Sequence, residues 1–458
     1  MSSMLSHFNK LMKAHSIPES VIRTFGSYYK LLESGASGQI PGSEIKAPSP
    51  ENLIDYNEVN SYRNQGILKN IVVIKLNGGL GTSMGLSAAK SLLPVKGNMN
   101  FLDIITRQVL SLRAGSGYEV LLMFMNSYNT EEDTLNYLNR YPDLGRQKLP
   151  LSFLQNRFPR IRQDNLKPYE NENEAKMWNP PGHGDIYAAL NTSGLLDRLI
   201  ESGYRYAFIS NSDNLGATVD TGIPAFMEEK GIQFLIEVCE RTAADRKGGH
   251  LSEDLNGRLL LREVAQCPAD ELDEFQNIEY YKYFNTNNIW VDLQALQWNL
   301  IAEDGVMILP LIVNPKVVDG TPVYQLETAM GAAINIFNNS RALVVPRSRF
   351  APVKKNTDLL AIWSDAYELN DQYQVVLKRG LDAPPLIELD ERYYGKIDQL
   401  LERFKDGVPS LAGCKSFKVT GDISFGEDVI CEGEVSITSS QPAYIKSKLI
   451  TQHLNLDS

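Results

Sequence analysis

The chain is short of positive charge. It has 458 residues, with 45 lysines and arginines against 56 aspartates and glutamates, which gives a formal net charge of −11. A protein that coats nucleic acid needs a basic surface to displace counterions from the phosphates, and a polybasic membrane binder needs one for anionic lipids. We therefore expect neither nucleic acid nor a membrane as a partner. Any anionic ligand must be bound by a few local positive groups.

Cysteine is also scarce. Cys239, Cys267, Cys414 and Cys431 lie far apart and form no CxxC pair, which argues against a zinc ribbon and a disulfide scaffold and favours reduced thiols. The first twenty residues lack the continuous apolar core of a signal peptide. No run reaches the ~18 apolar residues of a membrane span. The sequence thus predicts a cytoplasmic protein.

What is present falls into four segments. Residues 4–34 show apolar residues at helical spacing with a break near Pro18, where Ser16 is a candidate helix cap, and residues 35–52 are rich in Gly, Pro and Ser. We interpret residues 1–50 as a helical arm with a linker. A main α/β domain is expected at 51–356, a helical connection at 357–409, and a unit of different character at 410–458.

Short apolar runs recur through the main domain between segments of helical length. They lie at residues 70–76, 120–125, 206–210, 232–238, 306–313 and 342–346. Such runs, bounded by turn residues, favour a mixed or parallel sheet covered on both faces. Ligands of such sheets bind at the carboxyl ends of the strands.

The connection and the tail have their own patterns. Residues 357–380 and 391–407 are typical of helices. From Ser410 onward, β-forming residues alternate with Gly and Asp at short intervals, which fits either a few coils of a β-helix or a simple β-meander.

A glycine-rich loop directly after an apolar strand is the strongest local signal. Residues 71–96 read IVVIKLNGGLGTSMGLSAAKSLLPVK, and the loop contains Asn77, Gly78, Gly79, Gly81, Thr82 and Gly85, with Lys90 beyond it. A loop with so few side chains lets backbone N–H groups approach phosphate oxygens, and a nearby lysine supplies charge. It fits neither the Walker pattern nor the dinucleotide fingerprint. The alternatives are a phosphate site and a turn without a ligand.

Three polar segments are further candidates. Asp213 follows the run at 206–210 and suits Mg²⁺, which prefers few carboxylates together with phosphate oxygens, although an Asp in a turn is often a cap. His183 in PPGHGD could donate a hydrogen bond to a phosphate, or be a loop histidine without a role. The charge run VPRSRFAPVKK at 345–355 is either a ligand contact or a solvated face.

These segments together resemble the eukaryotic-type UTP–glucose-1-phosphate uridylyltransferases over about residues 50–440. The glycine loop resembles their nucleotide loop, and further motifs follow in the family's order: Gln155 in FLQNRFPRI, PPGHGDIYAAL, NSDNLGA, FNTNNIWVDL, QLETAMGAAI and VPRSRFAPVKKNTDLL. The resemblance implies a GT-A-like (Rossmann-like) nucleotidyltransferase domain with a mixed sheet, and a β-helix at the C-terminus.

The resemblance also implies roles for single residues. Lys354 and Lys90 would act in catalysis, and Lys355 would point to the other side of an extended segment. His183 would contact the sugar phosphate, Asn287 and Asn288 the sugar hydroxyls, and Asp213 would bind Mg²⁺. The nucleotide would be held by Leu76, Asn77, Gly78, Gly79, Gln155, Gly182, Asn211, Ser212 and Asp213, with Gln155 and Gly182 at the uracil ring.

The implied reaction joins UTP and a hexose 1-phosphate to give a UDP-hexose and pyrophosphate, most simply UDP-glucose. The family has Gly-Pro before the loop lysine, whereas here Ala88 and Ala89 precede Lys90, so galactose 1-phosphate or a broader range of sugars is an alternative, as is N-acetylglucosamine 1-phosphate. A non-catalytic nucleotide-sugar binding module is an alternative of another class. Relatives associate through the C-terminal region, so a homo-oligomer is one expectation and a monomer the other.

Overall fold

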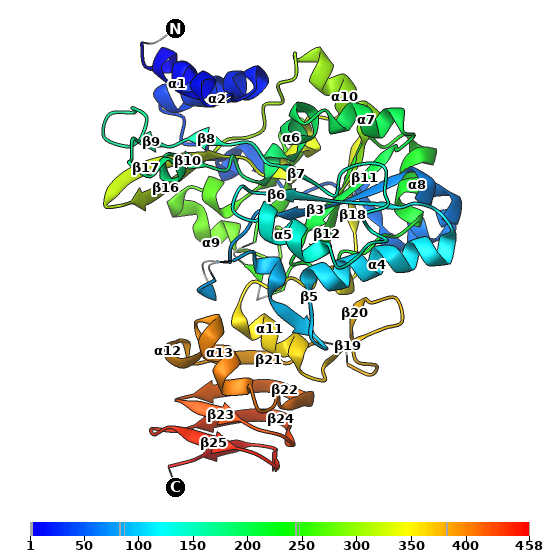
Figure 1. The fold of residues 1–458 in the computed structure, drawn as a ribbon, viewed down its shortest axis with the longest axis vertical. Coiled ribbons are helices and arrows are strands. Elements are labelled where there is room, and N and C mark those ends of the chain that lie inside the picture. Colours follow the sequence, from blue (N-terminus) through cyan, green and yellow to red (C-terminus); the bar gives the residue numbers. More distant parts are fainter. Residues whose placement is uncertain are drawn as a thin grey trace.

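One large sheet organises the middle of the chain. The computed structural model describes residues 3–81, 84–86, 88–242, 245–246, 248–381 and 383–457. Eight strands form the main path of the sheet (Figure 1) in the order β2 (Leu53–Asp55), β18 (Ser340–Val344), β12 (Phe234–Glu240), β15 (Tyr283–Asp292), β11 (Tyr206–Asn211), β3 (Ile71–Asn77), β6 (Leu121–Asn126) and β7 (Ser152–Leu154). β15 runs antiparallel to β11 and β12, and the other neighbours are parallel, so the predicted mixed sheet is confirmed.

Both faces of this sheet are buried, because helices cover each of them. On one face Val73 packs in a core with α4 (Phe101–Ser116) and α8 (Gly222–Lys230). On the other, Val72 and Ile74 pack with α6 (Ile186–Thr192), α7 (Leu195–Glu201) and α10 (Leu293–Ala302). Burying each such side chain stabilises the fold by roughly 1.5–3 kcal/mol. This is why the strands read as continuous apolar runs.

Five of the six predicted apolar runs are strands of this sheet. The run at 306–313 is not: β16 (Ile312–Val318) begins only at Ile312 and pairs with β17 (Thr321–Glu327) in a separate sheet. Pro310 lacks the N–H that a strand at this place would donate, which explains the error.

The N-terminal arm consists of α1 (Ser3–Ala14) and α2 (Glu19–Glu33), as predicted. Phe8 contacts Phe25 at a ring distance of 5.0 Å, and Phe25 contacts Phe158 of the main domain at 5.4 Å. The proposed capping by Ser16 is wrong: Pro18 precedes the first turn of α2 without a side-chain cap, and Ser16 has a positive φ of 55°.

The connection after Asn356 is helical only in part. α11 (Asn356–Trp363) ends early, and residues expected to continue it form the hairpin β19 (Tyr367–Leu369) and β20 (Val375–Leu377). Lys96 donates to the carbonyl oxygens of Ile362 and Ser364 at 2.8 and 2.6 Å and thereby caps the end of α11. Asn370 accepts hydrogen bonds from backbone N–H groups in the turn of this hairpin. The helices α12 (Glu391–Tyr394) and α13 (Ile397–Phe404) agree with the prediction at 391–407.

The C-terminal unit is a parallel β-helix, at the end of the molecule opposite to α1 and α2 (Figure 1). Its larger sheet contains β21 (Leu386–Leu389), β22 (Ser410–Thr420), β24 (Val429–Thr438), β26 (Lys448–Ile450) and β27 (His453–Asn455), and its smaller one β23 (Ile423–Phe425) and β25 (Ala443–Ile445). All pairs are parallel, whereas a meander would be antiparallel. The β-helix prediction is confirmed.

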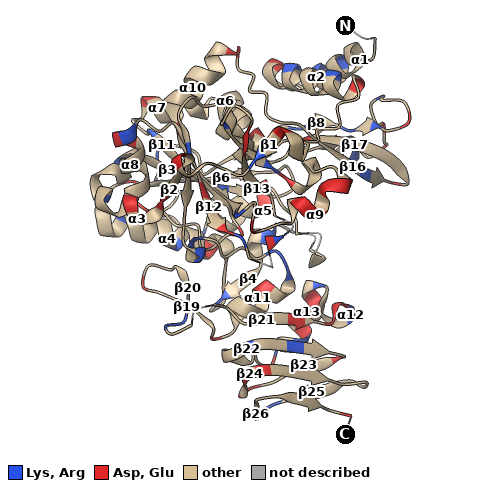
Figure 2. Ribbon diagram, turned by 180° about the vertical axis from the view of Figure 1, so that it is seen from behind, with Lys and Arg blue, Asp and Glu red and all other residues tan. Residues whose placement is uncertain are grey.

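Smaller elements complete the chain: α3 (Tyr56–Val59), α5 (Glu131–Leu138), α9 (Leu272–Phe275), β1 (Ile45–Lys46), β4 (Pro94–Lys96), β5 (Met99–Asn100), β8 (Phe158–Pro159), β9 (Ile161–Arg162), β10 (Trp178–Asn179), β13 (His250–Asp254) and β14 (Leu259–Arg262). Lys and Arg are scattered among Asp and Glu along the ribbon (Figure 2). In the described ranges, no helix has the length and apolarity to cross a membrane. The four cysteines are all free and buried.

Candidate active site

The predicted nucleotide residues meet at one edge of the sheet, because neighbouring parallel strands end there together. In the strand register, Asn77 at the end of β3 lies opposite Asn126 of β6, and Leu76 lies opposite Asn211 of β11. Gln155 follows β7 directly and its N–H donates to the carbonyl of Asn126 at 2.9 Å. The structure thus brings the glycine loop, Gln155 and the segment from Asn211 to Asp213 together.

Asn77 holds these strand ends in place rather than facing a ligand. Its amide donates to Asn126 Oδ1 and Thr134 Oγ1 at 2.8 Å each and accepts from Ser212 Oγ at 3.2 Å. The N–H of Ser212 donates to the carbonyl of Leu76 at 3.0 Å. Since the side chain of Asn77 is buried and engaged, only its backbone and that of the following glycines are left for a phosphate.

Two glycines of the loop, Gly78 and Gly81, lie against neighbouring side chains. A Cβ on Gly78 would lie 3.2 Å from Gln155 Nε2, so the amide of Gln155 rests on the bare backbone of the loop. Gly81 has a φ of +66°, and a Cβ there would lie 2.6 Å from Leu86. The carbonyl of Gly79 accepts from the N–H of Lys90 at 3.2 Å, which brings that lysine back to the loop. Thr82 lies outside the described residues.

Lys90 and Asp213 form an ion pair beside this loop. Lys90 Nζ lies 2.5 Å from Asp213 Oδ2, and the two side chains are 17% and 22% exposed. The pair is therefore largely shielded from solvent, but part of its surface is open to a ligand at the edge of the sheet. In the described residues, no group of three or more His, Cys, Asp or Glu is arranged to hold a metal ion. A cation at Asp213 would take its other ligands from phosphate oxygens and water.

His183 is held as a neutral imidazole. Its Nδ1 accepts from the N–H of Met330 at 3.0 Å, so the proton of the neutral ring resides on Nε2, where it can be donated to a ligand. Burial lowers the pKa of His183 to about 4. The loop around His183 is hydrogen-bonded to Thr328, because the N–H of Gly184 donates to the Thr328 carbonyl at 2.9 Å. Gly182 has a φ of +80°, and a Cβ there would clash with the same carbonyl oxygen.

Asp185 is a functional candidate that the sequence analysis missed. Its buried carboxylate accepts from the N–H and the side-chain amide of Asn156 at 2.5 and 2.9 Å. It therefore ties the segment that carries Gln155 to the loop that carries His183. Burial raises the pKa of Asp185 to about 7, against the hydrogen bonds from Asn156.

Asn287 and Asn288 differ in what they can contact. The pairing of β12 with β15 shifts register here, and Asn287 adopts a positive φ of 58°. Asn288 is fully buried: its amide donates to Glu237 at 3.1 Å and accepts from Asn214 at 3.0 Å. Asn287 is partly exposed and its Oδ1 accepts from Asn285 Nδ2 at 2.8 Å. Of the two side chains, only that of Asn287 has exposed surface open to a ligand, while Asn288 supports the strand behind it.

The two arginines of the charge run are not free. Arg347 pairs with Asp245 at 2.7 Å, and the buried Arg349 pairs with Glu237 at 2.6 Å. The reading of this run as a solvated face is therefore wrong for Arg349, because its partner Glu237 is buried in the sheet below.

A backbone hydrogen bond holds the segment that carries Lys354 next to Asp213. The N–H of Val353 donates to the carbonyl of Asp213 at 3.1 Å, and the N–H groups of Lys354 and Lys355 both donate to Asp358 at 2.8 Å. The ammonium group of Lys354 lies 5.7 Å from the Phe350 ring centre and is exposed. The charge of Lys354 lowers the pKa of the Glu263 carboxyl group. Burial has the larger effect and leaves the pKa of Glu263 above its ordinary value. No sequence pattern had pointed to Glu263.

The chain is similar to known nucleotidyltransferases along most of its length. A family model described as UTP–glucose-1-phosphate uridylyltransferase matches residues 22–432. A relative of that name from Hordeum vulgare is 40% identical over 435 residues, 93% of this chain and 90% of the relative.

Solved structures agree with this similarity. A UDP-glucose phosphorylase from Trypanosoma brucei is 43% identical with a TM-score of 0.90, covering 99% of this chain and 100% of that chain. A point mutant of UDP-glucose pyrophosphorylase from Leishmania major, in complex with UDP-glucose, is 41% identical with a TM-score of 0.93, covering 99% and 100%. The predicted α/β nucleotidyltransferase fold is thereby confirmed.

Proposed function

The chain belongs to the UTP–glucose-1-phosphate uridylyltransferase family, and from that premise we propose that it converts UTP and glucose 1-phosphate into UDP-glucose and pyrophosphate. The contact between Lys90 and Asp213 beside the glycine loop carries the proposal. In this contact the Lys90 ammonium group is the positive charge available to two anionic substrates in an acidic protein. The Asp213 carboxylate that balances it is the candidate ligand of a divalent cation. The names of the relatives support the reaction and the sugar.

The nucleotide would lie across the carboxyl edge of the sheet. Gln155 offers both a donor and an acceptor to the uracil ring, and the family resemblance assigns the backbone of Gly182 to the same ring. The phosphates would lie over the backbone from Leu76 to Gly79 and beside Lys90. Asn211 and Ser212 continue this surface from the adjacent strand.

The sugar phosphate would be held from the opposite loops. His183 donates from Nε2 to its phosphate, and Asn287 faces the hexose hydroxyls, with Asn288 fixing the strand behind. Lys354 would compensate the charge that develops at the reacting phosphates. These assignments follow the family resemblance, and the clustering of the residues supports them.

We assign Mg²⁺ to Asp213. Mg²⁺ is usually bound by one or two carboxylates together with substrate phosphates, so a single partly exposed carboxylate at this edge fits the ion. When bound, it would neutralise phosphate charge. Asp213 would then exchange part of its contact with Lys90 for the ion, which leaves the lysine ammonium available to the nucleotide.

The reaction needs no general base. A phosphate monoester has its second pKa near 6 and is largely a dianion at neutral pH. One of its oxygens attacks the α-phosphorus of UTP in line, the new P–O bond forms, and the bond to the β-phosphate oxygen breaks to release pyrophosphate. Lys90 and Lys354 would stabilise the negative charge as it moves onto the leaving group. His183, neutral in the folded protein, binds and orients but transfers no proton.

A sugar panel tests the function and its specificity. Purified full-length protein is assayed for pyrophosphate release from UTP with glucose, galactose and N-acetylglucosamine 1-phosphates. We expect the highest kcat/KM for glucose 1-phosphate. A preference for galactose 1-phosphate would indicate that Ala88 and Ala89 before Lys90 change the sugar specificity. No pyrophosphate release with any of the three sugars would favour a binding module instead.

We also propose a cytoplasmic location, which the four free cysteines support. For self-association, the last coil of the β-helix is the candidate surface, because β26 and β27, which both pair with β24, are the last strands of that unit. Light scattering of the full chain and of a variant with a proline in β27 would test it.

A further inference from the structure

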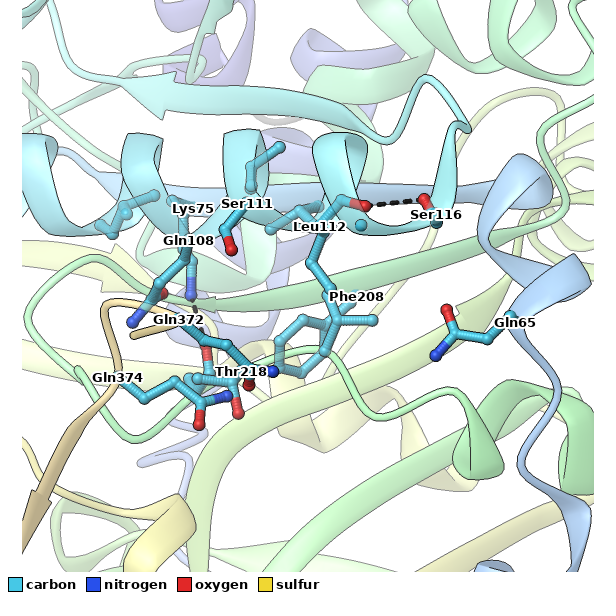
Figure 3. A pocket seen from close by; sticks show the side chains of 16 residues that line it. Gln65, Lys75, Gln108, Ser111, Leu112, Ser116, Phe208, Thr218, Gln372 and Gln374 are labelled. Atoms are coloured by element: carbon cyan, nitrogen blue, oxygen red, sulfur yellow. Dashed lines mark hydrogen bonds between the residues drawn. The ribbon is translucent and has the colours of Figure 1, made fainter. Parts of the chain in front are cut away.

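A cavity apart from the candidate active site lies on the side of the sheet that α4 covers (Figure 3). It has a volume of about 260 Å³, and none of the residues assigned above to nucleotide, sugar or metal lines it. Lys75 of β3 and Phe208 of β11 form its floor, Gln108 and Leu112 of α4 form one wall, and Thr218 and Gln374 close it from two loops. Its size is suited to a small ligand.

Lys75 brings a charge into this cavity. Its side chain is almost fully buried, with 2% exposure, and Nζ donates to Ser210 Oγ at 2.7 Å and to the Ala217 carbonyl at 2.9 Å. An ammonium group has three N–H donors, so one is left for a molecule in the cavity, beside the Phe208 ring, whose centre lies 5.5 Å from Nζ. Among the described residues that line the cavity, Lys75 is the only one with an ionisable side chain.

The rest of the lining is divided between apolar and neutral polar groups. Val73, Val109, Leu112, Phe208 and Val219 give an apolar surface. Gln108 is fixed by a bond from its amide nitrogen to the Tyr373 carbonyl at 3.0 Å. The cavity thus pairs one buried cation with apolar walls and a rim of amides.

We propose that this cavity is a second ligand site, which binds an organic monocarboxylate with a compact apolar body. One cation balances one negative charge, whereas a free phosphate dianion would bring a second charge into a site without a second cation. The apolar walls require a hydrocarbon or aromatic body, and the third N–H of Lys75 donates to the carboxylate. The site is independent of the proposed uridylyl transfer.

The protonation of Lys75 links binding to pH. Burial first, and then the charge of Arg349, lower the pKa of Lys75 to about 7, against the opposing effect of Glu237. Arg349 and Glu237 pair with each other, and the elements packed on the cavity add no other ionisable lining group in the described residues. A carboxylate binds the ammonium form, which predominates below pH 7. Affinity should therefore fall as the pH rises above 7.

Lys75 also supports the loop that follows Asp213, through its bond to Ala217, so its replacement alone would not isolate the ligand site. A second variant leaves the lysine in place and fills the cavity. Ser111, half-buried on α4, lines the cavity and suits this purpose as Ser111→Phe. Lys69→Met, at an exposed lysine outside the cavity, is the matched control for Lys75→Met.

Isothermal titration calorimetry of the full chain with benzoate, benzamide and inorganic phosphate tests the proposal. Benzamide has the shape of benzoate without its charge, and phosphate has charge without the apolar body. At about pH 6 we expect benzoate to bind at least about tenfold more tightly than either, and at about pH 8.5 to bind at least about tenfold more weakly than at pH 6. Lys75→Met and Ser111→Phe should each lose this binding, and Lys69→Met should keep it.

Three results would overturn the proposal. They are equal binding of benzoate and benzamide, binding of benzoate that survives in either cavity variant, and no binding of benzoate up to about 10 mM at pH 6. Thermal unfolding of each variant establishes that it is folded. If Lys75→Met does not fold, the result with Ser111→Phe decides whether the cavity binds benzoate. Uridylyl transfer by the wild-type protein is scored separately, so its failure would leave these outcomes unchanged.

Discussion

Lys90 Nζ and Asp213 Oδ2 are 2.5 Å apart, although 123 residues separate them in the chain. The contact exists because β3 and β11 are neighbouring parallel strands and end at the same edge. A lysine from one loop and a carboxylate from the next are thereby placed at the edge where we propose that the nucleotide triphosphate and Mg²⁺ bind.

Replacing Asp213 by Asn should weaken the binding of Mg²⁺ and slow turnover. The amide keeps the size of the side chain but loses the charge that a hard cation prefers. We expect the half-saturating Mg²⁺ concentration to rise at least about tenfold and kcat to fall at least about 100-fold. Asp164→Asn, at an exposed carboxylate paired with Arg162, is the control. An unchanged half-saturating Mg²⁺ concentration in Asp213→Asn would show that Asp213 does not bind the metal ion.

Lys354→Ala should lower kcat at least about 100-fold, which is the scale of losing one preorganised donor. The chain provides a matched control in Lys355→Ala, since the N–H groups of both lysines bind Asp358 in the same way. We expect the control to stay within about threefold of the wild type. Steady-state assays of pyrophosphate release measure both, and similar losses in the two variants would contradict the assignment to Lys354.

His183→Leu should raise the KM for glucose 1-phosphate at least about tenfold and leave the KM for UTP nearly unchanged. His183→Gln, which keeps an acceptor for Met330 N–H and a donor for the ligand, should lose less. Because the pKa of His183 is about 4, its protonation should produce no inflection in the rate between about pH 5 and 8. An equal loss in both variants, or a higher KM for UTP alone, would be inconsistent with this role.

Asp185 should make the folded protein less stable as the pH rises. Its pKa is about 7 when folded and 3.8 ordinarily, so the folded state retains a proton that the unfolded state has released. The stabilisation is complete below about pH 4 and is lost as the pH rises through 7, by up to about 1.4 kcal/mol for each pH unit between the two pKa values.

Asp185→Asn cannot ionise, so its free energy of unfolding should rise relative to the wild type between about pH 4 and 7. Urea unfolding at several pH values measures the difference, with Asp164→Asn as a reference for an exposed carboxylate. A difference that is the same at every pH would mean that Asp185 is ionised in the folded protein throughout.

The sequence predicted what short stretches determine. A strand that runs into a glycine loop, and an Asp directly after another strand, are local patterns, and both lie at the predicted edge. The end of α11 was not predictable in this way, because Lys96, which caps it, lies 266 residues earlier. Asp185 and Glu263 were missed for the same reason: their roles depend on Asn156 and Lys354, from distant segments. Asn287 and Asn288 look alike in the sequence, and only the register shift in β15 separates them.

The structure of the protein bound to UDP-glucose tests the central claim most directly. We expect the phosphates over the backbone of Gly78 and Gly79, with the ammonium groups of Lys90 and Lys354 within about 4 Å of phosphate oxygens. A complex with UDP-glucose elsewhere, the glycine loop empty and either ammonium group in bulk solvent, would contradict the account.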